Sequence, residues 1–391
     1  AFVMTTRTEQ TFRPPVMEAA SWIDGKDFSD LSLINVSQAA PIDPPPDVLI
    51  DYMAEVLRED STHLYGPVLG IPELRSEIAT RWSEAYVSDI KKSQVGITSG
   101  CNQAFSASIS MLCAEGDEVI LPTPFYFNHK MWLDMAGIKT VMLQCASNMV
   151  PDPKDAASLI NDRTRAIVLV SPNNPCGVEY PSDVITAFYE LAQKFKLALI
   201  IDETYRDFYS LDEMPHQLFQ NDKWEETLIH LYSFSKAYRI TGHRIGAIIT
   251  SEKRLTEIEK FLDTVSICPN QLGQKAALWG MQNLSKWLSK EREEILTRKK
   301  AIIDNFMILK EKGWELLGVG AYFAYVRHPF LIDSDQLCKK LVDDVSVLTL
   351  PGTMFVPKDD HSGKRQIRIA FANIDAKKIK TLFNRLATLT E

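Results

Sequence analysis

Apolar residues fall in short continuous runs along much of the chain, and helical patterns lie between these runs. Runs that are apolar at successive positions, rather than at every second one, are typical of strands buried on both faces of a parallel sheet. The runs cover residues 95–98, 116–122, 139–144, 165–172, 197–203, 227–233 and 244–250, with helical patterns at 102–113 and 182–195. The pattern predicts a large α/β domain whose mostly parallel sheet is flanked by helices.

The pattern changes after Asn270. A long helical stretch leads into three further apolar runs with helices between them. The helical stretch covers 284–312, and the runs cover 314–317, 321–326 and 366–371. This arrangement predicts a smaller α+β domain.

Four prolines near the N-terminus mark a rigid connector that is neither helix nor central strand. They are Pro41, Pro44, Pro45 and Pro46. We therefore expect an N-terminal arm that forms part of the small domain at 1–45, the large domain at 46–270 and the small domain at 271–391.

Composition narrows the class of protein. The chain has 391 residues, 45% hydrophobic and 24% charged, with a net charge of −8. This acidic balance argues against nucleic acid or an anionic membrane as the main partner. The six cysteines form no CxxC pair and no zinc-binding spacing, and no window reaches the roughly 18 apolar residues of a membrane span. We expect a soluble cytoplasmic protein with reduced thiols, no bound metal and no membrane contact.

Polar residues follow three of the apolar runs directly. Ligands of parallel α/β sheets bind beyond the carboxyl ends of the strands, so these residues are the first candidates for a site. Asn174 follows the run at 167–170, Asp202 and Tyr205 follow the next run, and Lys236 follows the run at 228–232. We expect all four side chains along one rim of the sheet.

Lys236 has an unusual sequence context. Ser233 and Ser235 flank it, and Arg244 stands eight residues later between two glycines of the stretch TGHRIG. A lysine amine becomes a nucleophile when burial lowers its pKa, and an arginine at fixed spacing suits an anionic cofactor.

The run at 95–98 adds a candidate phosphate site. Ser99, Gly100 and Cys101 begin a helical pattern there, and free backbone N–H groups at a helix N-terminus bind phosphate.

Together, an amine, an acid, an amide, a phenol and an anion pocket match the needs of pyridoxal 5′-phosphate. From about Gln38 to the last helix, the chain resembles the fold type I pyridoxal-phosphate enzymes of the class I/II aminotransferase family. The resemblance implies the transferase fold of those enzymes, with a seven-stranded sheet in the large domain. It also implies pyridoxal 5′-phosphate as cofactor.

The resemblance assigns roles to the cofactor side of the site. Lys236 would be the Schiff-base lysine that later shuttles a proton, and Asp202 would pair with the pyridine nitrogen. Tyr205 and Asn174 would bond the phenolic oxygen of the ring. Arg244 and Ser233 would hold the phosphate with Ser235, Ser99, Gly100 and Cys101. Tyr126 matches the aromatic residue that stacks on the ring, with Phe125 as the alternative.

The resemblance also assigns substrate contacts. Arg368 matches the arginine that binds the substrate α-carboxylate, assisted by Asn174. Tyr65 matches a tyrosine that reaches the phosphate of a neighbouring subunit, which implies a homodimer. Ala39 stands where relatives often have glycine, so its methyl group would crowd a substrate carboxylate. The segment 266–274 lacks the arginine that dicarboxylate-specific relatives present there, which puts strict aspartate specificity in doubt.

Simpler readings of these residues stay open at this point. Lys236 could be a surface lysine, Asp202 a cap or turn residue, and Asn174 a turn former. Arg368 could be a cross-strand ion-pair partner, and Tyr126 and Tyr65 core aromatics. We expect the arm around Phe12, Trp22 and Ile23 to line or close the substrate pocket.

The sequence therefore predicts a pyridoxal-phosphate-dependent aminotransferase (transaminase) that moves an amino group from an amino acid to a 2-oxo acid. The alternative is a C–S β-lyase, since the same cofactor supports elimination. A regulator with an aminotransferase-like domain is disfavoured because the chain is acidic and only some forty residues precede the match. A dinucleotide-dependent oxidoreductase is disfavoured because no GxGxxG motif follows the first strand.

Overall fold

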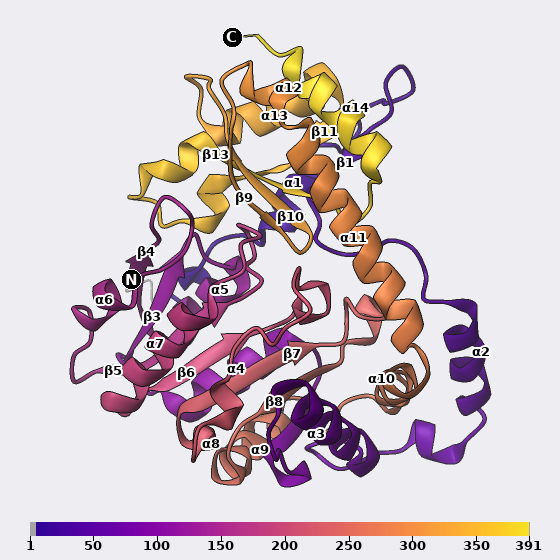
Figure 1. The fold of residues 1–391 in the computed structure, drawn as a ribbon, viewed down its shortest axis with the longest axis vertical. Coiled ribbons are helices and arrows are strands. Elements are labelled where there is room, and N and C mark those ends of the chain that lie inside the picture. The colour runs from indigo at the N-terminus through magenta and orange to yellow at the C-terminus, as the bar shows by residue number, and fades with distance from the viewer. Residues whose placement is uncertain (1–4, 391) are drawn as a thin grey trace.

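The computed structural model describes residues 5–390, which fold into two domains linked by the long helix α11 (Ser285–Asn305) (Figure 1). The large domain lies below and the small domain above in this view, with α11 along one side of both. Residues 1–4 of the expected N-terminal arm lie outside the described residues.

A seven-stranded sheet forms the centre of the large domain, in the order β2-β8-β7-β6-β5-β3-β4. The strands are β2 (Val95–Thr98), β3 (Glu118–Thr123), β4 (Lys139–Gln144), β5 (Thr164–Val170), β6 (Ala198–Asp202), β7 (Leu228–Ser233) and β8 (Gly246–Ile249). The five neighbouring strands from β4 to β7 run parallel to one another. Strand β8 lies between β7 and β2 and runs antiparallel to both. The predicted mostly parallel seven-stranded sheet is confirmed.

Helices cover both faces of this sheet because its strands are apolar on both faces. In β6, Leu199 and Ile201 point to one core cluster, and Ala198 and Ile200 point to the other. The first cluster includes residues of α3 (Pro72–Tyr86), α7 (Ser182–Lys194) and α10 (Gln271–Asn283). The second includes residues of α4 (Cys101–Leu112), α5 (Phe127–Met135) and α9 (Glu252–Ser266).

The small domain is built on an antiparallel sheet in the order β12-β13-β10-β9. Its elements are β9 (Glu315–Gly320), β10 (Phe323–Arg327), α13 (Ser334–Val345), β11 (Val347–Leu348), β12 (Leu350–Pro351), β13 (Gln366–Ala370) and α14 (Ala376–Ala387). The short strand β1 (Ile34–Asn35) pairs with β11. The arm that carries β1 is therefore paired with a strand of the small domain.

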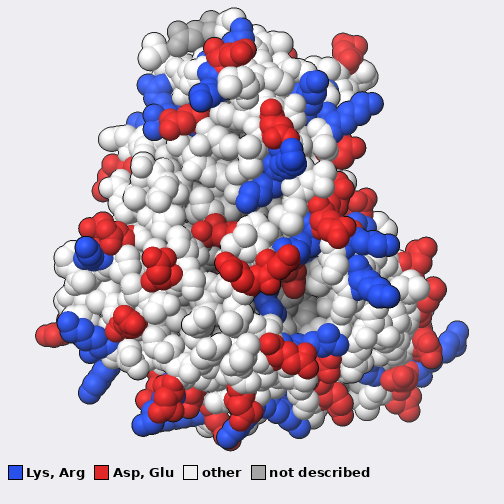
Figure 2. All heavy atoms as spheres, in the orientation of Figure 1, with Lys and Arg blue, Asp and Glu red and all other residues white. Residues whose placement is uncertain are grey.

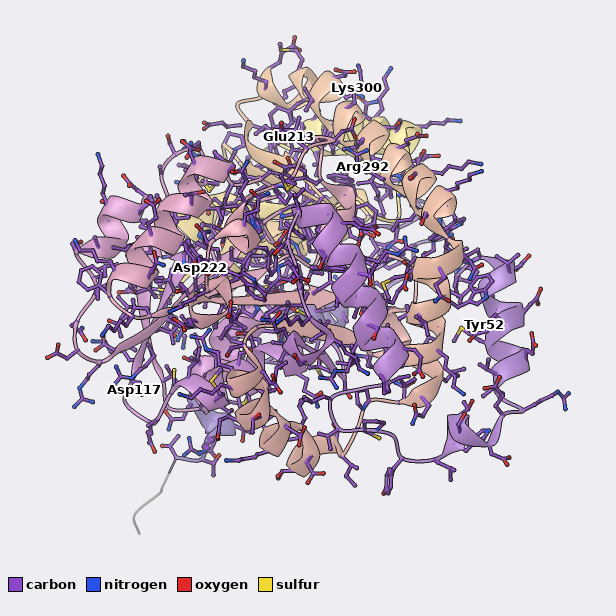
Figure 3. The ribbon with its side chains drawn as sticks, turned by 60° about the horizontal axis from the view of Figure 1, so that its bottom comes forward. Tyr52, Asp117, Glu213, Asp222, Arg292 and Lys300 are labelled. Carbon is purple, nitrogen blue, oxygen red and sulfur yellow. The ribbon has the colours of Figure 1, made fainter. Side chains whose placement is uncertain are left out.

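Helix α10 belongs to the core of the large domain, although we expected it in the small one. Its residues Ala276, Ala277 and Met281 pack in the first core cluster. Tyr52 of α2 (Asp47–Val56), which Figure 3 labels, stacks on Trp279 of α10 with ring centroids 5.2 Å apart. We therefore propose that the division between the domains lies within α11 rather than at residue 270.

Helix α11 contacts both domains. Arg292 donates to the backbone oxygen of Tyr209 at 2.8 Å and pairs with Asp212 at 3.1 Å, beside the loop that carries Glu213 (Figure 3). The preceding residue, Glu291, accepts two hydrogen bonds from Arg239, at 3.0 and 2.6 Å. At the other end, α11 packs on α14.

The surface carries both signs of charge. Lysine and arginine are interspersed with aspartate and glutamate over the face shown in Figure 2. Within the described residues, no helix is both long enough and apolar enough to cross a bilayer.

A buried carboxylate joins three elements of the large domain. Glu203 follows β6, and Tyr86 of α3 donates to its Oε1 at 2.7 Å. His216 Nε2 lies 2.8 Å from its Oε2. His230 Nδ1 of β7 lies 2.8 Å from the same oxygen, off the hydrogen-bond axis. Burial alone would raise the pKa of Glu203, but the two histidines whose ring nitrogens face Oε2 hold that pKa well below its usual value.

These three side chains have the composition of a metal site, yet their protons are already placed. The N–H of Leu218 donates to His216 Nδ1 at 3.2 Å, and Trp82 Nε1 donates to His230 Nε2 at 3.0 Å. Each histidine therefore carries its own proton on the nitrogen that faces Glu203. A metal ion there would require both histidines to turn an N–H toward another N–H donor. We conclude that this cluster is a structural anchor.

Replacing Glu203 with glutamine should lower the free energy of unfolding by about 3 kcal/mol at pH 7, because the new amide N–H₂ meets donors that have lost their acceptor. Urea unfolding measures the change. Glu190→Gln, at an exposed position of α7, should stay within about 0.5 kcal/mol of the parent.

The pH dependence has a defined sign. Because folding lowers the pKa of Glu203, its contribution is complete above the ordinary value of 4.5 and is lost as pH falls through the folded value. The stability gap between parent and Glu203→Gln should therefore narrow in acid. Equal stability of Glu203→Gln and the control at pH 7 would contradict the anchor role.

Candidate active site

A cavity of about 220 Å³ opens between the two domains, beyond the carboxyl ends of the parallel strands. Most of the predicted site residues line it. They are Ala39, Cys101, Tyr126, Asn174, Asp202, Tyr205, Ser233, Ser235, Lys236, Arg244 and Arg368. The cavity lies where the rule for parallel sheets places ligand sites, at the strand ends. Its predicted lining residues come from both domains and are spread over more than 300 residues of the sequence.

Three predicted residues do not line the cavity. Ser99 and Gly100 stand directly before α4, and Tyr65 lies on the surface with 80% of its area exposed. Gly100 has φ +88, and a Cβ at this position would lie 2.3 Å from Nη2 of Arg244. Glycine is therefore required for the arginine to approach the start of α4.

Lys236 lies in the loop after β7 and opens into the cavity. Burial lowers the pKa of its amine to about 8, and the positive charges of Arg244 and Arg368 act in the same direction. A surface lysine would feel neither influence. The amine is therefore prepared to act as a nucleophile or a base near neutral pH.

Arg244 and the two serines form an anion-binding corner. Arg244 Nη1 donates to Ser235 Oγ at 3.2 Å and to the backbone oxygen of Thr241 at 3.1 Å. The N–H of Ser235 donates to Ser233 Oγ at 3.1 Å. Arg244 itself has φ +54, a left-handed conformation that costs energy for a side chain of this size. Such strain at a cavity wall is typical of functional sites.

Asp202 ends β6 and is held by partners that the sequence analysis missed. His129 Nε2 lies 3.3 Å from Oδ2, and Thr204 donates to Oδ1 from its N–H at 3.0 Å and its hydroxyl at 2.6 Å. Burial alone would raise the pKa of Asp202, but the bonds from His129 and Thr204 leave that pKa below its usual value. The side chain is a fixed carboxylate rather than a helix cap.

His129 could have been found from its spacing. It stands three residues after Tyr126, one turn into α5, so both side chains lie on the same face. Its ring stacks on Phe105 with centroids 4.0 Å apart and meets the Tyr126 ring edge-on at 4.9 Å.

Asn174 points into the cavity, and its neighbour Asn173 makes the turn. Asn173 Oδ1 accepts from the N–H of Cys176 at 2.9 Å, which is the turn chemistry considered for Asn174. Asn174 Oδ1 accepts from Arg368 Nη1 at 2.8 Å. The amide N–H₂ of Asn174 is therefore the group left to donate to a ligand.

Arg368 crosses from the small domain with a buried guanidinium. Its Nη2 donates to the backbone oxygen of Ser37 at 2.6 Å, while its Nε has no partner among the described residues. Its cross-strand neighbours, Tyr325 and Leu350, are uncharged, so it is not a cross-strand ion-pair partner. Burial lowers the pKa of Arg368 to about 10, and nearby tyrosines oppose this effect. The guanidinium of Arg368 is therefore fixed in position and can bind an anionic group of a ligand.

Three aromatic residues line the cavity: Tyr126, Phe127 and Tyr205. Of the two alternatives for the stacking residue, Tyr126 lines it, while Phe125 lines a separate cavity beneath the N-terminal arm. The Tyr126 hydroxyl donates to Asn102 Oδ1 at 3.1 Å. Tyr205 is buried edge-on against Tyr322 and Phe323.

The first helix of the N-terminal arm also reaches the cavity, but not through the aromatic residues expected to line it. Val16 of α1 (Pro15–Ser21) lines it, whereas Phe12 and Trp22 line the neighbouring cavity.

Cys101 is a wall residue rather than a second nucleophile. Burial raises the pKa of its thiol well above the usual value, and the charge of Asp202 adds to this effect. All six cysteines are free thiols.

The donor set fits pyridoxal 5′-phosphate. Among the described residues that line the cavity, the charged side chains are Lys236, Arg244, Arg368 and Asp202. Three cations and one carboxylate suit a ligand with a phosphate, a carboxylate and a protonated ring nitrogen. The unpartnered Nε of Arg368 and the close approach of Arg244 to Gly100 point to the same conclusion.

Comparison with known proteins gives the same picture. The model of the family "Aminotransferase class I and II" matches residues 32–386. An aspartate aminotransferase of Thermotoga maritima is 28% identical over 326 residues, which covers 83% of this chain and 84% of that protein. An aromatic aminotransferase of Arabidopsis thaliana is also 28% identical, over 79% of this chain and 78% of that one.

Solved structures agree. The aspartate aminotransferase structure from Thermotoga maritima has a TM-score of 0.84 at 26% identity and covers 98% of this chain and 99% of its own. A mutant aspartate aminotransferase from Thermus thermophilus has a TM-score of 0.88 at 22% identity, covers 99% of both chains and supports the fold. These relatives support transamination, and nothing in them favours the β-lyase alternative. The chain belongs to the aminotransferase class I and II family and is a transaminase.

Proposed function

We propose that this transaminase binds pyridoxal 5′-phosphate through Lys236 and transfers the amino group of an amino acid to a 2-oxo acid. One observation carries the proposal. An amine with a pKa of about 8 opens into the same cavity as a fixed carboxylate and two guanidinium groups, and each matches one part of that cofactor or of its substrate.

Each residue then has a defined task. Arg244, Ser233, Ser235 and the start of α4 would hold the phosphate, and Tyr126 would cover one face of the ring. Asp202, kept ionised by His129 and Thr204, would keep a proton on the ring nitrogen. Tyr205 and the free N–H₂ of Asn174 would donate to the phenolic oxygen.

When bound, pyridoxal 5′-phosphate supplies an electron sink that makes the Cα proton of an amino acid removable. Arg368 would orient the substrate by its carboxylate, with Asn174 fixing the guanidinium at 2.8 Å. Lys236 Nζ, freed as a neutral amine, would then move the proton from Cα.

The relatives do not agree on an amino donor. The Thermotoga maritima protein is named for aspartate and the Arabidopsis thaliana protein for aromatic substrates. The amino donor of this chain is therefore set by its own pocket.

We propose a homodimer in which Tyr65 reaches the site of the second copy. Tyr65 and Leu64 are 80% and 65% exposed, although the loop that carries them is fixed. The backbone oxygen of Leu64 accepts from Gln271 at 3.2 Å, and the N–H of Gly66 contacts Cys268 Sγ at 3.4 Å. A fixed loop that exposes two large apolar side chains is typical of an interface.

We also propose a cytoplasmic location. Six free thiols suit a reducing compartment.

Lys236→Ala should reduce transamination by at least about 10³-fold, because both the covalent attachment and the proton transfer are lost. Borohydride reduction followed by peptide mass spectrometry should find a pyridoxyl group on Lys236 in the parent and none at that peptide in the variant. Lys290→Ala, at an exposed lysine of α11, is the matched control and should behave as the parent. A pyridoxyl group attached elsewhere in the parent would refute the assignment.

The lowered pKa of Lys236 predicts how cofactor uptake depends on pH. At pH 7, one unit below a pKa of about 8, about one amine in ten is neutral, and only that form attacks an aldehyde. Covalent uptake by cofactor-free protein, trapped with borohydride, should rise with pH to a half-maximum near 8 and level off above it. A rate that keeps rising to pH 10 would mean that the amine is unperturbed.

The dimer predicts complementation between an inactive chain, Lys236→Ala, and a chain with weakened cofactor retention, Tyr65→Ala. Light scattering should give twice the chain mass of 44.2 kDa. Tyr65→Ala should weaken cofactor retention by roughly tenfold through the loss of a bond to phosphate. A mixture refolded with Lys236→Ala should regain activity, because one site of each mixed dimer then has both side chains. A monomer, or a mixture without recovery, would disprove the shared site.

A further inference from the structure

Carboxamide side chains gather on the outer part of the cavity wall. Gln38 lies in the connector after β1, Asn102 in the first turn of α4, and Asn128 in the first turn of α5. Gln38 and Asn102 are exposed and Asn128 is half-buried. Three amides from three separate elements thus face the space that remains after the cofactor contacts are assigned.

These amides have hydrogen-bonding capacity to spare. Asn102 Oδ1 accepts from the Tyr126 hydroxyl at 3.1 Å, which leaves its N–H₂ to donate outward. The N–H₂ of Asn128 makes only a weak contact, 3.6 Å from the sulfur of Met131. Each group is a neutral donor or acceptor for a polar ligand atom.

The position of Arg368 directs a substrate side chain toward them. Arg368 Nη2 donates to the backbone oxygen of Ser37 at 2.6 Å, so the guanidinium adjoins Gln38 and Ala39 in the wall. A substrate held there by its α-carboxylate has the segment from Gln38 to Ala40 beside its Cα. Its side chain would then extend along this segment toward the amides.

Within one subunit, the described wall residues leave no cation for a second carboxylate. Among the described residues that line the cavity, Lys236, Arg244 and Arg368 are the positive side chains, and each is already matched to a cofactor or α-carboxylate group. Two basic residues that lie close in sequence to wall residues are paired with carboxylates outside the cavity lining. Arg13 pairs with Glu18 at 2.6 Å, and Lys130 pairs with Asp134. A carboxylate moved from water to this wall would lose hydration without gaining an ion pair.

We propose that the enzyme takes amino acids with uncharged side chains, prefers a side-chain amide to a carboxylate of the same size, and uses Gln38, Asn102 and Asn128 as its specificity-determining residues. The proposal rests on the function proposed above. It adds the substrate class, which the names of the relatives leave open.

Isosteric substrate pairs test the proposal directly. Glutamine and glutamate, and asparagine and aspartate, differ at one side-chain group only. Conversion of the holoenzyme by each amino acid alone, followed by absorbance, gives kcat/KM for the first half of the reaction. We expect the amide of each pair to be favoured by at least about tenfold. Equal or higher values for the acids would overturn the proposal.

Binding without turnover gives a second measurement. Glutaramate and glutarate lack the amino group, so they occupy the site without reacting, and they differ only by amide against carboxylate. Calorimetric titration of the holoenzyme should give a Kd at least about tenfold lower for glutaramate. Tighter binding of glutarate would contradict the neutral wall.

Adding one cation should reverse the preference. In Gln38→Lys, the ratio of kcat/KM for glutamate to that for glutamine should rise by at least about tenfold, because the ammonium pairs with the distal carboxylate. Gln193→Lys, the same change at an exposed position of α7, should leave the ratio unchanged. An unchanged ratio in both variants would remove Gln38 from the specificity site.

The two proposals fail in different ways. If the parent gives no pyridoxyl group on Lys236 and converts no amino acid, the proposed function is wrong. If that group forms and the acidic amino acids react faster, only the substrate class is wrong.

Discussion

A hydrogen bond between the two domains defines the cavity. Arg368 comes from β13 of the small domain, Asn174 comes from the turn after β5 of the large one, and they meet at 2.8 Å. The second bond of Arg368 ties in the backbone at Ser37. Neither domain alone contains the site, because the group that would hold the substrate is oriented by a residue of the other domain.

The charge balance of the cavity shows what it is built to receive. Three cations share a partly enclosed space with one carboxylate, an arrangement that is unfavourable without further anions. Arg368 lies on the faces of Phe323 and Phe355, 4.8 and 5.1 Å from their ring centroids, which offsets part of its desolvation. The left-handed backbone at Arg244 adds to the cost. These features lower the stability of the folded protein, but they hold the anion-binding groups in position before a ligand binds.

The sequence predicts the sheet and its carboxyl-end residues well, for a simple reason. Runs such as 197–201 are apolar on both faces, and Asp202 and Lys236 come directly after such runs. The ends of the strands can therefore be located from the sequence alone, and the topology of a parallel sheet places these ends along one edge.

The residues that sequence analysis missed come mostly from other kinds of position. His129, Asn102 and Asn128 lie in the first turns of helices, where the direction of a side chain depends on how the helix packs. The role proposed for Gln38 depends on the pairing of the N-terminal arm with the small domain, which places it beside Arg368. We propose a boundary beyond α10 rather than at residue 270, because the apolar residues of α10 indicate a buried face in the sequence without indicating which domain covers it.

Helix α11 has a mechanical consequence. Its 21 residues form a rigid rod of about 30 Å. The Arg239–Glu291 pair fastens this rod three residues beyond Lys236, and the far end rests on α14. A tilt of about 3° about one end would shift the other by roughly 1.5 Å. Through this helix, a rotation of the small domain would be transmitted to the peptide that carries the Lys236 amine.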